Sequence, residues 1–145
     1  MKRTAGRRAR PRAGATAGVA DLVRLAREAR LRAHAPFSKF KVGAALRTRG
    51  GEIVTGCNIE NASYGPTLCA ERVAVFKAVS EGLREFDAIA VVADAPRPTA
   101  PCGPCRQILW EFCGDIVVHM VDLAGRRRTM RMSELLPLPF DRRNL

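Results

Sequence analysis

The chain has 145 residues, 47% of them hydrophobic, which is enough for one globular domain with its own core. Its longest apolar stretches fall far short of a membrane span, and no charged-then-apolar signal peptide opens the sequence. Five cysteines are an odd number, so a secreted disulfide framework is not expected and a reducing cytoplasm fits better.

The net charge of +11 is concentrated at the N-terminus. The basic residues that precede the first acid, Asp21, are Lys2, Arg3, Arg7, Arg8, Arg10 and Arg12. Because this segment lacks apolar periodicity, we expect residues 1–18 to form a disordered basic tail and residues 19–145 to form the folded domain. Three interpretations of the tail stay open: a weak tether for polyanions, a solvated extension, and an upstream start codon assigned in error. A transit peptide is poorly supported, because the tail has no serine.

The first expected elements are a helix and a hairpin. An apolar stripe of helical period runs over residues 19–33, and Pro36 ends that element. Residues 40–46 predict a strand, Arg49-Gly50-Gly51 a tight turn, and residues 52–59 the partner strand of a hairpin.

The middle of the chain alternates helix and strand. A helix is expected over residues 68–81, with Thr67 as its N-cap and Gly82 just beyond its end. Residues 88–93 form a continuous apolar run, which is typical of a buried central strand. Residues 104–112 predict a further helix, which begins at a proline suited to a first turn.

The chain is expected to close with strands over residues 116–121 and 127–132, followed by a helical turn over residues 133–136 capped by Ser133. The connection between these strands is too short for a crossover, so they should pair antiparallel. The order α-β-β-α-β-α-β-β predicts an α/β fold of three layers, α/β/α, around a mixed five-stranded sheet.

Three cysteines have the spacing of a catalytic zinc site. Cys69 lies in Cys69-Ala70-Glu71-Arg72, and the other two lie in Pro101-Cys102-Gly103-Pro104-Cys105. Three thiolates fill three corners of a tetrahedron and leave the fourth for water, whereas structural zinc sites are usually closed by four protein ligands. We therefore expect Cys69, Cys102 and Cys105 to hold one Zn²⁺ per chain. A structural zinc knuckle is the weaker interpretation, because the chain has one C-x-x-C pair and no histidine near it.

The charge of such a site must be balanced. Each cysteine motif begins a predicted helix, where free N–H groups and the helix dipole favour thiolate over thiol. Three thiolates on Zn²⁺ still leave a net charge of about −1, which opposes the ionisation of water. Arg72 and Arg106 are expected to compensate this charge, and the alternative is that they are surface or packing residues.

Glu71 follows Cys69 by two residues and is not needed to hold the metal. Zinc deaminases that act on nucleobases use such a glutamate as general acid and base. We expect Glu71 to take a proton from water, to deliver it to ring nitrogen N3 of a pyrimidine and to protonate the departing ammonia. An acid that only stabilises the first turn of a helix is the alternative.

Four collinear segments resemble the small, homotetrameric cytidine deaminases, and the resemblance covers about Val19 to Phe140. The segments are Pro36–Leu46 (PFSKFKVGAAL), Gly56–Gly65 (GCNIENASYG), Cys69–Arg72 (CAER) and Pro101–Gln107 (PCGPCRQ). The resemblance implies that residues 19–145 are a catalytic domain that deaminates cytidine and 2'-deoxycytidine to uridine and 2'-deoxyuridine in pyrimidine salvage. It also implies a cytoplasmic homotetramer with shared active sites.

The resemblance further implies a nucleoside-binding set. Asn58 and Glu60 match the pair that binds the ribose hydroxyls, and Phe40 matches the aromatic residue that packs against the base. The backbone of Ala70 would help to read the pyrimidine edge. Plain packing is the alternative for Phe40. A free base has no ribose to bond with Asn58 and Glu60, so these polar groups would stay unpaired and substrates that lack the sugar would bind less well.

Tyr64 and Phe140 match family residues that reach the site of a neighbouring subunit, and plain packing is the alternative for Tyr64. The chain departs from the family pattern at Phe37, where tyrosine is common, and at Pro66, where an aliphatic residue is usual. The first departure removes one hydroxyl, and neither removes a catalytic group.

Two alternative functions stay open. One is an aminohydrolase of the same architecture that acts on a modified cytosine nucleoside of the blasticidin type. The other is a nucleic-acid-binding protein or polynucleotide deaminase that uses the basic tail. This second alternative predicts strongly salt-dependent binding that is lost when residues 1–18 are removed. The main interpretation involves neither nucleic acid nor a membrane.

Overall fold

The computed structural model describes residues 18–145, so the expected tail lies outside the described residues except for Gly18. The elements follow the expected order: α1 (Val19–Arg30), β1 (Val42–Thr48), β2 (Ile53–Cys57), α2 (Ala70–Ser80), β3 (Phe86–Ala93), α3 (Gly103–Cys113), β4 (Val117–Asp122), β5 (Arg127–Arg131), α4 (Met132–Leu135) and the 3₁₀ helix η1 (Arg142–Asn144). None of the described helices is long and apolar enough to cross a membrane.

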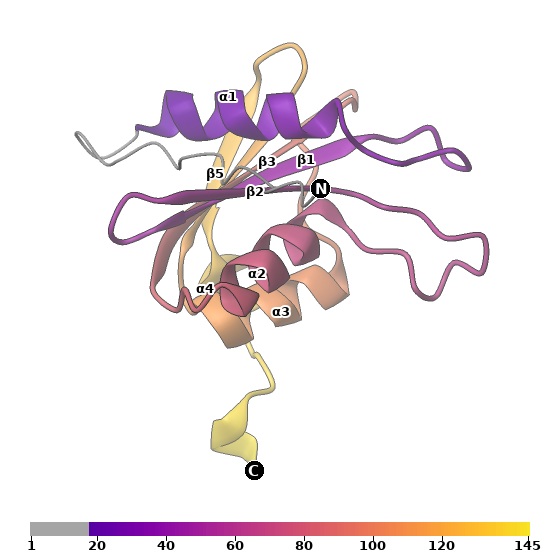
Figure 1. The fold of residues 1–145 in the computed structure, drawn as a ribbon. Helices are drawn as coiled ribbons and strands as arrows, with labels where there is room; N and C mark the ends of the chain where they lie inside the picture. Colours follow the sequence, from indigo (N-terminus) through magenta and orange to yellow (C-terminus); the bar gives the residue numbers. More distant parts are fainter. Residues whose placement is uncertain (1–17) are drawn as a thin grey trace, which may run out of the picture.

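The five strands form one mixed sheet in the order β2-β1-β3-β4-β5. β3 and β4 run parallel, while β1 pairs antiparallel with both β2 and β3. β4 and β5 pair antiparallel, as the short connection between them predicts. Helix α1 covers one face of the sheet, and α2 and α3 cover the other (Figure 1). The three-layer α/β/α prediction is therefore confirmed.

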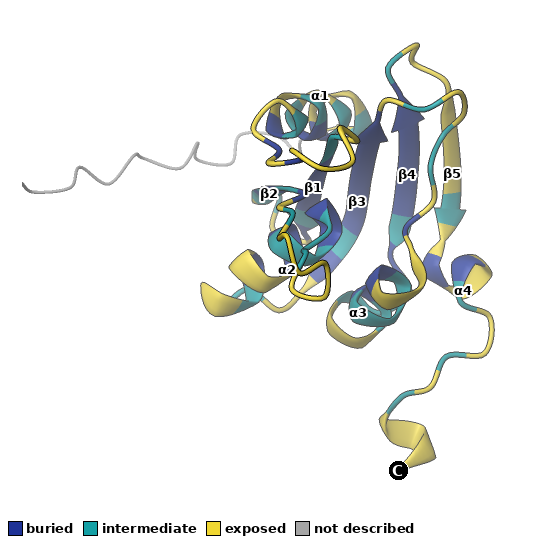
Figure 2. Cartoon of the chain, turned by 90° about the vertical axis from the view of Figure 1, so that its right-hand side faces the viewer, coloured by how far each residue is buried: buried dark blue, intermediate teal, exposed yellow. Residues whose placement is uncertain are grey.

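The core has two parts because the sheet is buried on both faces. The larger cluster lies between the sheet and helices α2 and α3 and includes Leu46, Ile89 and Leu109, all fully buried. The smaller one lies under α1 and includes Leu22 and Val92. β3 is buried along most of its length, as its apolar sequence predicts for a central strand (Figure 2).

Two glycines allow helices to lie very close to the sheet. A Cβ atom on Gly56 would lie 2.4 Å from the carbonyl oxygen of Ala70 and 2.6 Å from the amide nitrogen of Ala74. A Cβ on Gly43 would lie 2.0 Å from the carbonyl oxygen of Ala26, in α1. Glycine at position 56 thus sets the depth of the N-terminal turn of α2, which carries the candidate catalytic residues.

Three expectations about helix ends are wrong. The sequence predicts a first helix that continues until Pro36, but α1 ends at Arg30. Three i→i+3 hydrogen bonds follow, and the backbone of His34 then bonds to the backbones of Asn58 and Glu60. Cys69, and not Thr67, occupies the N-cap of α2, because the Thr67 hydroxyl accepts a hydrogen bond from the Asn61 N–H instead.

Ser133 is likewise not the cap of the last helical turn. α4 begins at Met132, and Arg131 occupies the N-cap position, where its N–H donates to the Glu134 carboxylate. The Ser133 N–H donates to Asp115 at 2.7 Å.

Candidate active site

The three cysteines come together where α2 and α3 begin. Cys69 is the N-cap of α2, Cys102 is the N-cap of α3, and Cys105 is fully buried in the first turn of α3. Their Sγ atoms all lie within 4.8 Å of one another, with 3.7 Å from Cys69 to Cys102 and 3.3 Å from Cys102 to Cys105. Zn–S bonds of about 2.3 Å in a tetrahedron place sulfur atoms about 3.8 Å apart, so the cluster fits Zn²⁺ with little adjustment.

The thiols of this cluster do not ionise equally. Hydrogen bonding to the Cys105 thiol, together with the Arg72 guanidinium, lowers the pKa of Cys69 to about 5. The same pairing with Cys69, and burial, raise the pKa of Cys105. Cys69 is therefore the first of these two thiols to become a thiolate, the form that binds a metal.

Arg72 is in direct contact with the cluster. Its Nη2 donates to Cys69 Sγ at 3.4 Å and to the carbonyl of Thr67 at 3.2 Å. Its Nε is buried and lacks an acceptor among the described residues. The contact with Cys69 is compatible with charge compensation by Arg72, which remains a prediction.

Arg106 has different partners. Its Nε donates to the carbonyl of Pro101 at 2.7 Å, and its Nη1 donates to the carbonyl of Leu135 at 2.8 Å. The side chain thus fixes the segment that leads into Cys102 against α4. Charge compensation by Arg106 remains a prediction.

Glu71 lies in the first turn of α2, two residues from Cys69, and is only 5% exposed. Burial, with a smaller contribution from the charge on Cys69, raises the pKa of this carboxyl to about 7. A carboxyl group with a pKa near neutrality can both accept and donate a proton under physiological conditions. The position and the protonation behaviour suit the expected general acid and base.

Asn58 is buried directly after β2, and its side-chain amide already has partners. The Val42 N–H donates to Oδ1 at 2.8 Å, and Nδ2 donates to the carbonyl of Phe40 at 2.8 Å. One lone pair on Oδ1 and one N–H on Nδ2 remain for a ligand. The adjacent residue, Ile59, bridges to Leu68, which places this segment next to the beginning of α2.

Glu60 is half-buried and binds the loop that precedes β1. Its carboxylate accepts hydrogen bonds from the Ser38 hydroxyl and from the N–H groups of Phe37 and Ser38, at 2.9 and 3.2 Å. The bond from the Ser38 hydroxyl is the main reason that the pKa of Glu60 is lowered. Asn58 and Glu60 therefore hold the backbone of the loop that carries Phe40, a structural role that the motifs containing these residues do not indicate by themselves.

The remaining candidates differ in exposure. Ala70 is fully buried as the first residue of α2, and Phe40 is 38% exposed. Tyr64 is 72% exposed and meets only the edge of Phe37 among aromatic rings of the described chain, at a centroid distance of 6.3 Å. Phe140 is 60% exposed, and its carbonyl oxygen accepts a hydrogen bond from Gln107 of α3. Because Tyr64 is so exposed, packing in the core of this chain does not explain its presence.

Comparison with known proteins agrees with this geometry. The family described as "Cytidine and deoxycytidylate deaminase zinc-binding region" matches residues 19–120. A cytidine deaminase from Sporosarcina psychrophila is 48% identical over 128 residues, which are 88% of this chain and 94% of that protein. The crystal structure of a cytidine deaminase from Burkholderia pseudomallei superposes with a TM-score of 0.84 at 46% identity, over 86% of this chain and 100% of that one.

A blasticidin-S deaminase from Bacillus cereus is a more distant relative, 34% identical over 113 residues, which are 72% of this chain and 80% of that protein. The family match, the high identity over nearly whole chains and the three-cysteine cluster all agree on one assignment. This chain belongs to the cytidine deaminase family of zinc-dependent hydrolases.

Proposed function

We propose that this protein deaminates cytidine and 2'-deoxycytidine by hydrolysis, giving uridine and 2'-deoxyuridine with release of ammonia, as a step of pyrimidine salvage. One observation carries the proposal. Three thiols lie within 4.8 Å of one another, and a carboxyl group 5% exposed lies on the same helical turn as the first of them. A cluster that only stabilised the fold would need a fourth ligand and no such acid.

Cys69, Cys102 and Cys105 would hold the metal, and Arg72 would offset part of the thiolate charge. When bound, Zn²⁺ supplies Lewis-acid chemistry that brings the pKa of water near 7. The N-terminal ends of α2 and α3, which carry these thiols, add the favourable end of the helix dipole.

Glu71 would move the protons of the reaction. Its carboxylate takes a proton from the attacking water and gives it to N3 of the cytosine ring while oxygen bonds to C4. The second proton of that water passes through Glu71 to the amino group, which leaves as ammonia, and C4 becomes a carbonyl. Cytidine and water are thus converted to uridine and ammonia without any other reactant.

Asn58 and Glu60 would bind the ribose hydroxyls with the acceptor and donor sites that their loop contacts leave open. Phe40, whose backbone Asn58 holds, would pack against the base, and the backbone of Ala70 would read the edge of the pyrimidine. In this arrangement the same two polar side chains recognise the sugar and fix the aromatic residue.

The assembled enzyme is proposed to be a homotetramer in which Tyr64 and Phe140 reach the site of another subunit. The support for this is that both rings are largely exposed in the single chain, at 72% and 60%. A cytoplasmic location is proposed because all five cysteines are free thiols. Residues 19–145 are proposed as the catalytic domain, and residues 1–18 as an accessory tail.

A modified cytosine nucleoside of the blasticidin type is the second candidate substrate. The 34% identity to the blasticidin-S deaminase from Bacillus cereus favours it. The deciding experiment offers the purified protein cytidine, 2'-deoxycytidine, free cytosine and blasticidin S in parallel and follows loss of the cytosine ultraviolet band. The proposal predicts rapid turnover of the two nucleosides and little turnover of cytosine. Turnover of blasticidin S alone would replace the proposal with the second candidate, and equal use of cytosine and cytidine would refute the ribose assignment.

A further inference from the structure

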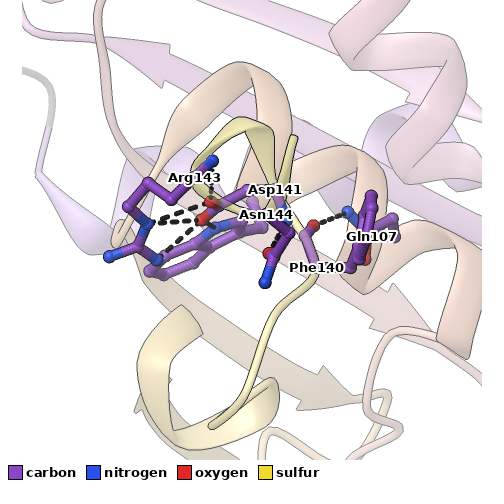
Figure 3. A network of polar contacts seen from close by, with 6 residues as sticks. Gln107, Phe140, Asp141, Arg143 and Asn144 are labelled. Carbon is purple, nitrogen blue, oxygen red and sulfur yellow. Dashed lines mark hydrogen bonds and ion pairs between the residues drawn. The ribbon is translucent and has the colours of Figure 1, made fainter.

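The C-terminal segment is tied to helix α3 by a small polar cluster (Figure 3). The indole Nε1 of Trp110 donates to Asp141 Oδ2 at 3.0 Å. Arg143 donates to both oxygens of the same carboxylate, through Nε at 2.9 and 3.1 Å and through Nη2 at 2.7 Å. We call Trp110, Asp141 and Arg143 the C-terminal latch.

The carboxylate at the centre of the latch is well enclosed. The Asp141 side chain is 11% exposed, although Arg143 beside it is 72% exposed. The hydrogen bonds from Arg143, Trp110 and the Arg143 N–H lower the pKa of Asp141 far below its usual range. The carboxylate therefore stays charged at every pH at which the protein would be assayed.

A second bond fixes the neighbouring residue. Gln107 Nε2, also from α3, donates to the carbonyl oxygen of Phe140 at 2.7 Å (Figure 3). Gln107 lies two residues beyond Cys105 on the same helix. The backbone of Phe140 is thus fixed to the element that carries two of the three zinc ligands.

Apolar packing does not hold this segment. Leu138 is 94% exposed, Phe140 60% and Leu145 97%. Polar bonds from Trp110 and Gln107 instead hold the Asp141 carboxylate and the Phe140 carbonyl, while Phe140 stays 60% exposed and available to a second molecule. A rigid backbone that presents an exposed aromatic ring reduces the entropy lost on binding.

We infer that the C-terminal latch is a positioning device that holds Phe140 in the orientation in which it enters the active site of a second copy of this chain. Trp110, Asp141 and Arg143 are positioning residues, because they act through Phe140 and do not touch the nucleoside. The inference rests on the proposed function, and specifically on the role proposed there for Phe140.

The test uses three variants of the full chain, Asp141→Ala, Phe140→Ala and the double variant, with Arg142→Ala as the matched control. Arg142 is an exposed neighbour of the latch in the same 3₁₀ helix. Trp110 is the one tryptophan of the chain, so its emission reports directly on the latch. Cytidine kinetics, zinc content and melting temperature are measured on every sample.

We expect Asp141→Ala to shift the Trp110 emission and to raise its quenching by acrylamide. KM for cytidine should rise about tenfold, as expected when hydrogen bonds to a charged group are lost. Zinc content and kcat should change little, since the catalytic groups are untouched. The double variant should be no worse than Phe140→Ala alone, because the two residues act as one unit. Arg142→Ala should behave as the unmodified protein.

Three results would overturn the inference: an unchanged KM in Asp141→Ala although the fluorescence shows the latch to be open, additive effects in the double variant, or an unchanged KM in Phe140→Ala. Each of these arises in a protein that still deaminates cytidine. Absence of turnover in the unmodified zinc-loaded protein would instead overturn the proposed function, and the inference with it.

Discussion

Gly56→Ala is the most informative single substitution, because it moves the catalytic helix without removing a catalytic group. The new Cβ would lie 2.4 Å from the Ala70 carbonyl oxygen and 2.6 Å from the Ala74 amide nitrogen, both in α2. Ordinary contacts begin at 3.4 Å, so the first turn of α2 must retreat by about 1 Å, a displacement that costs about 100-fold in rate when it affects reacting groups. We therefore expect kcat/KM for cytidine to fall by about that factor.

The assay compares kcat/KM, zinc content and melting temperature with those of Gly43→Ala. That control crowds the opposite face of the sheet, where its Cβ would lie 2.0 Å from the Ala26 carbonyl oxygen in α1. Both variants should lose about 1–3 kcal/mol of stability through overpacking. Only Gly56→Ala should lose activity, because α1 carries none of the candidate catalytic residues. Full activity in a folded Gly56→Ala protein, or an equal loss in Gly43→Ala, would refute the reasoning.

Three further outcomes are expected. Cys102→Ala should lose zinc, measured by elemental analysis, and one retained zinc per chain would contradict the ligand assignment. Asn58→Ala should raise KM for cytidine and lower stability by about 1 kcal/mol, since the partly buried Val42 N–H and Phe40 carbonyl lose their partner; an unchanged KM would argue against ribose binding. Burial, with the charges of Arg127 and Arg47, lowers the pKa of His119 below 6.5, so the folded protein keeps it neutral and stability falls as pH decreases through 6.5 and below. The melting temperature of His119→Gln should therefore depend less on pH between 8 and 5 than that of the unmodified protein, and identical profiles would contradict this.

Much of the fold follows from local sequence patterns. The apolar run at residues 88–93 identifies the central strand, and the short connection before Arg127 fixes the antiparallel pairing of β4 and β5. The cysteine motifs likewise predict the cluster. Cys69 and Cys102 are the N-cap residues of α2 and α3, so both thiols lie at a helix N-terminus. The strands depend on residues that lie close together in the chain, whereas Cys69 and Cys102, 33 residues apart, are recognised because each lies in a short motif typical of a zinc site.

The error at the start of α2 comes from competition for a polar partner. Thr67 has the right residue type for an N-cap, but its hydroxyl binds the Asn61 N–H and closes the loop instead. Asn58 and Glu60 are recognisable as ligand-binding residue types, yet their bonds to the Phe37–Val42 loop depend on a tertiary contact that spacing does not reveal.

The C-terminal latch shows the same limit more strongly. Trp110 and Asp141 are separated by 31 residues, and neither belongs to a motif. Only the packing of the C-terminal segment on α3 brings them together. Contacts of this kind have no local sequence signal and must be observed.

The central claim is that the three-cysteine cluster and Glu71 form one hydrolytic centre. It is tested most directly by measuring zinc content and cytidine turnover on the same samples of the unmodified protein and Glu71→Gln. The account predicts about one zinc per chain in both proteins. It predicts conversion of cytidine to uridine by the unmodified protein and a loss of kcat of at least about 10²–10⁴-fold in the variant. Comparable turnover in Glu71→Gln, or undiminished turnover in protein that holds no zinc, would contradict it.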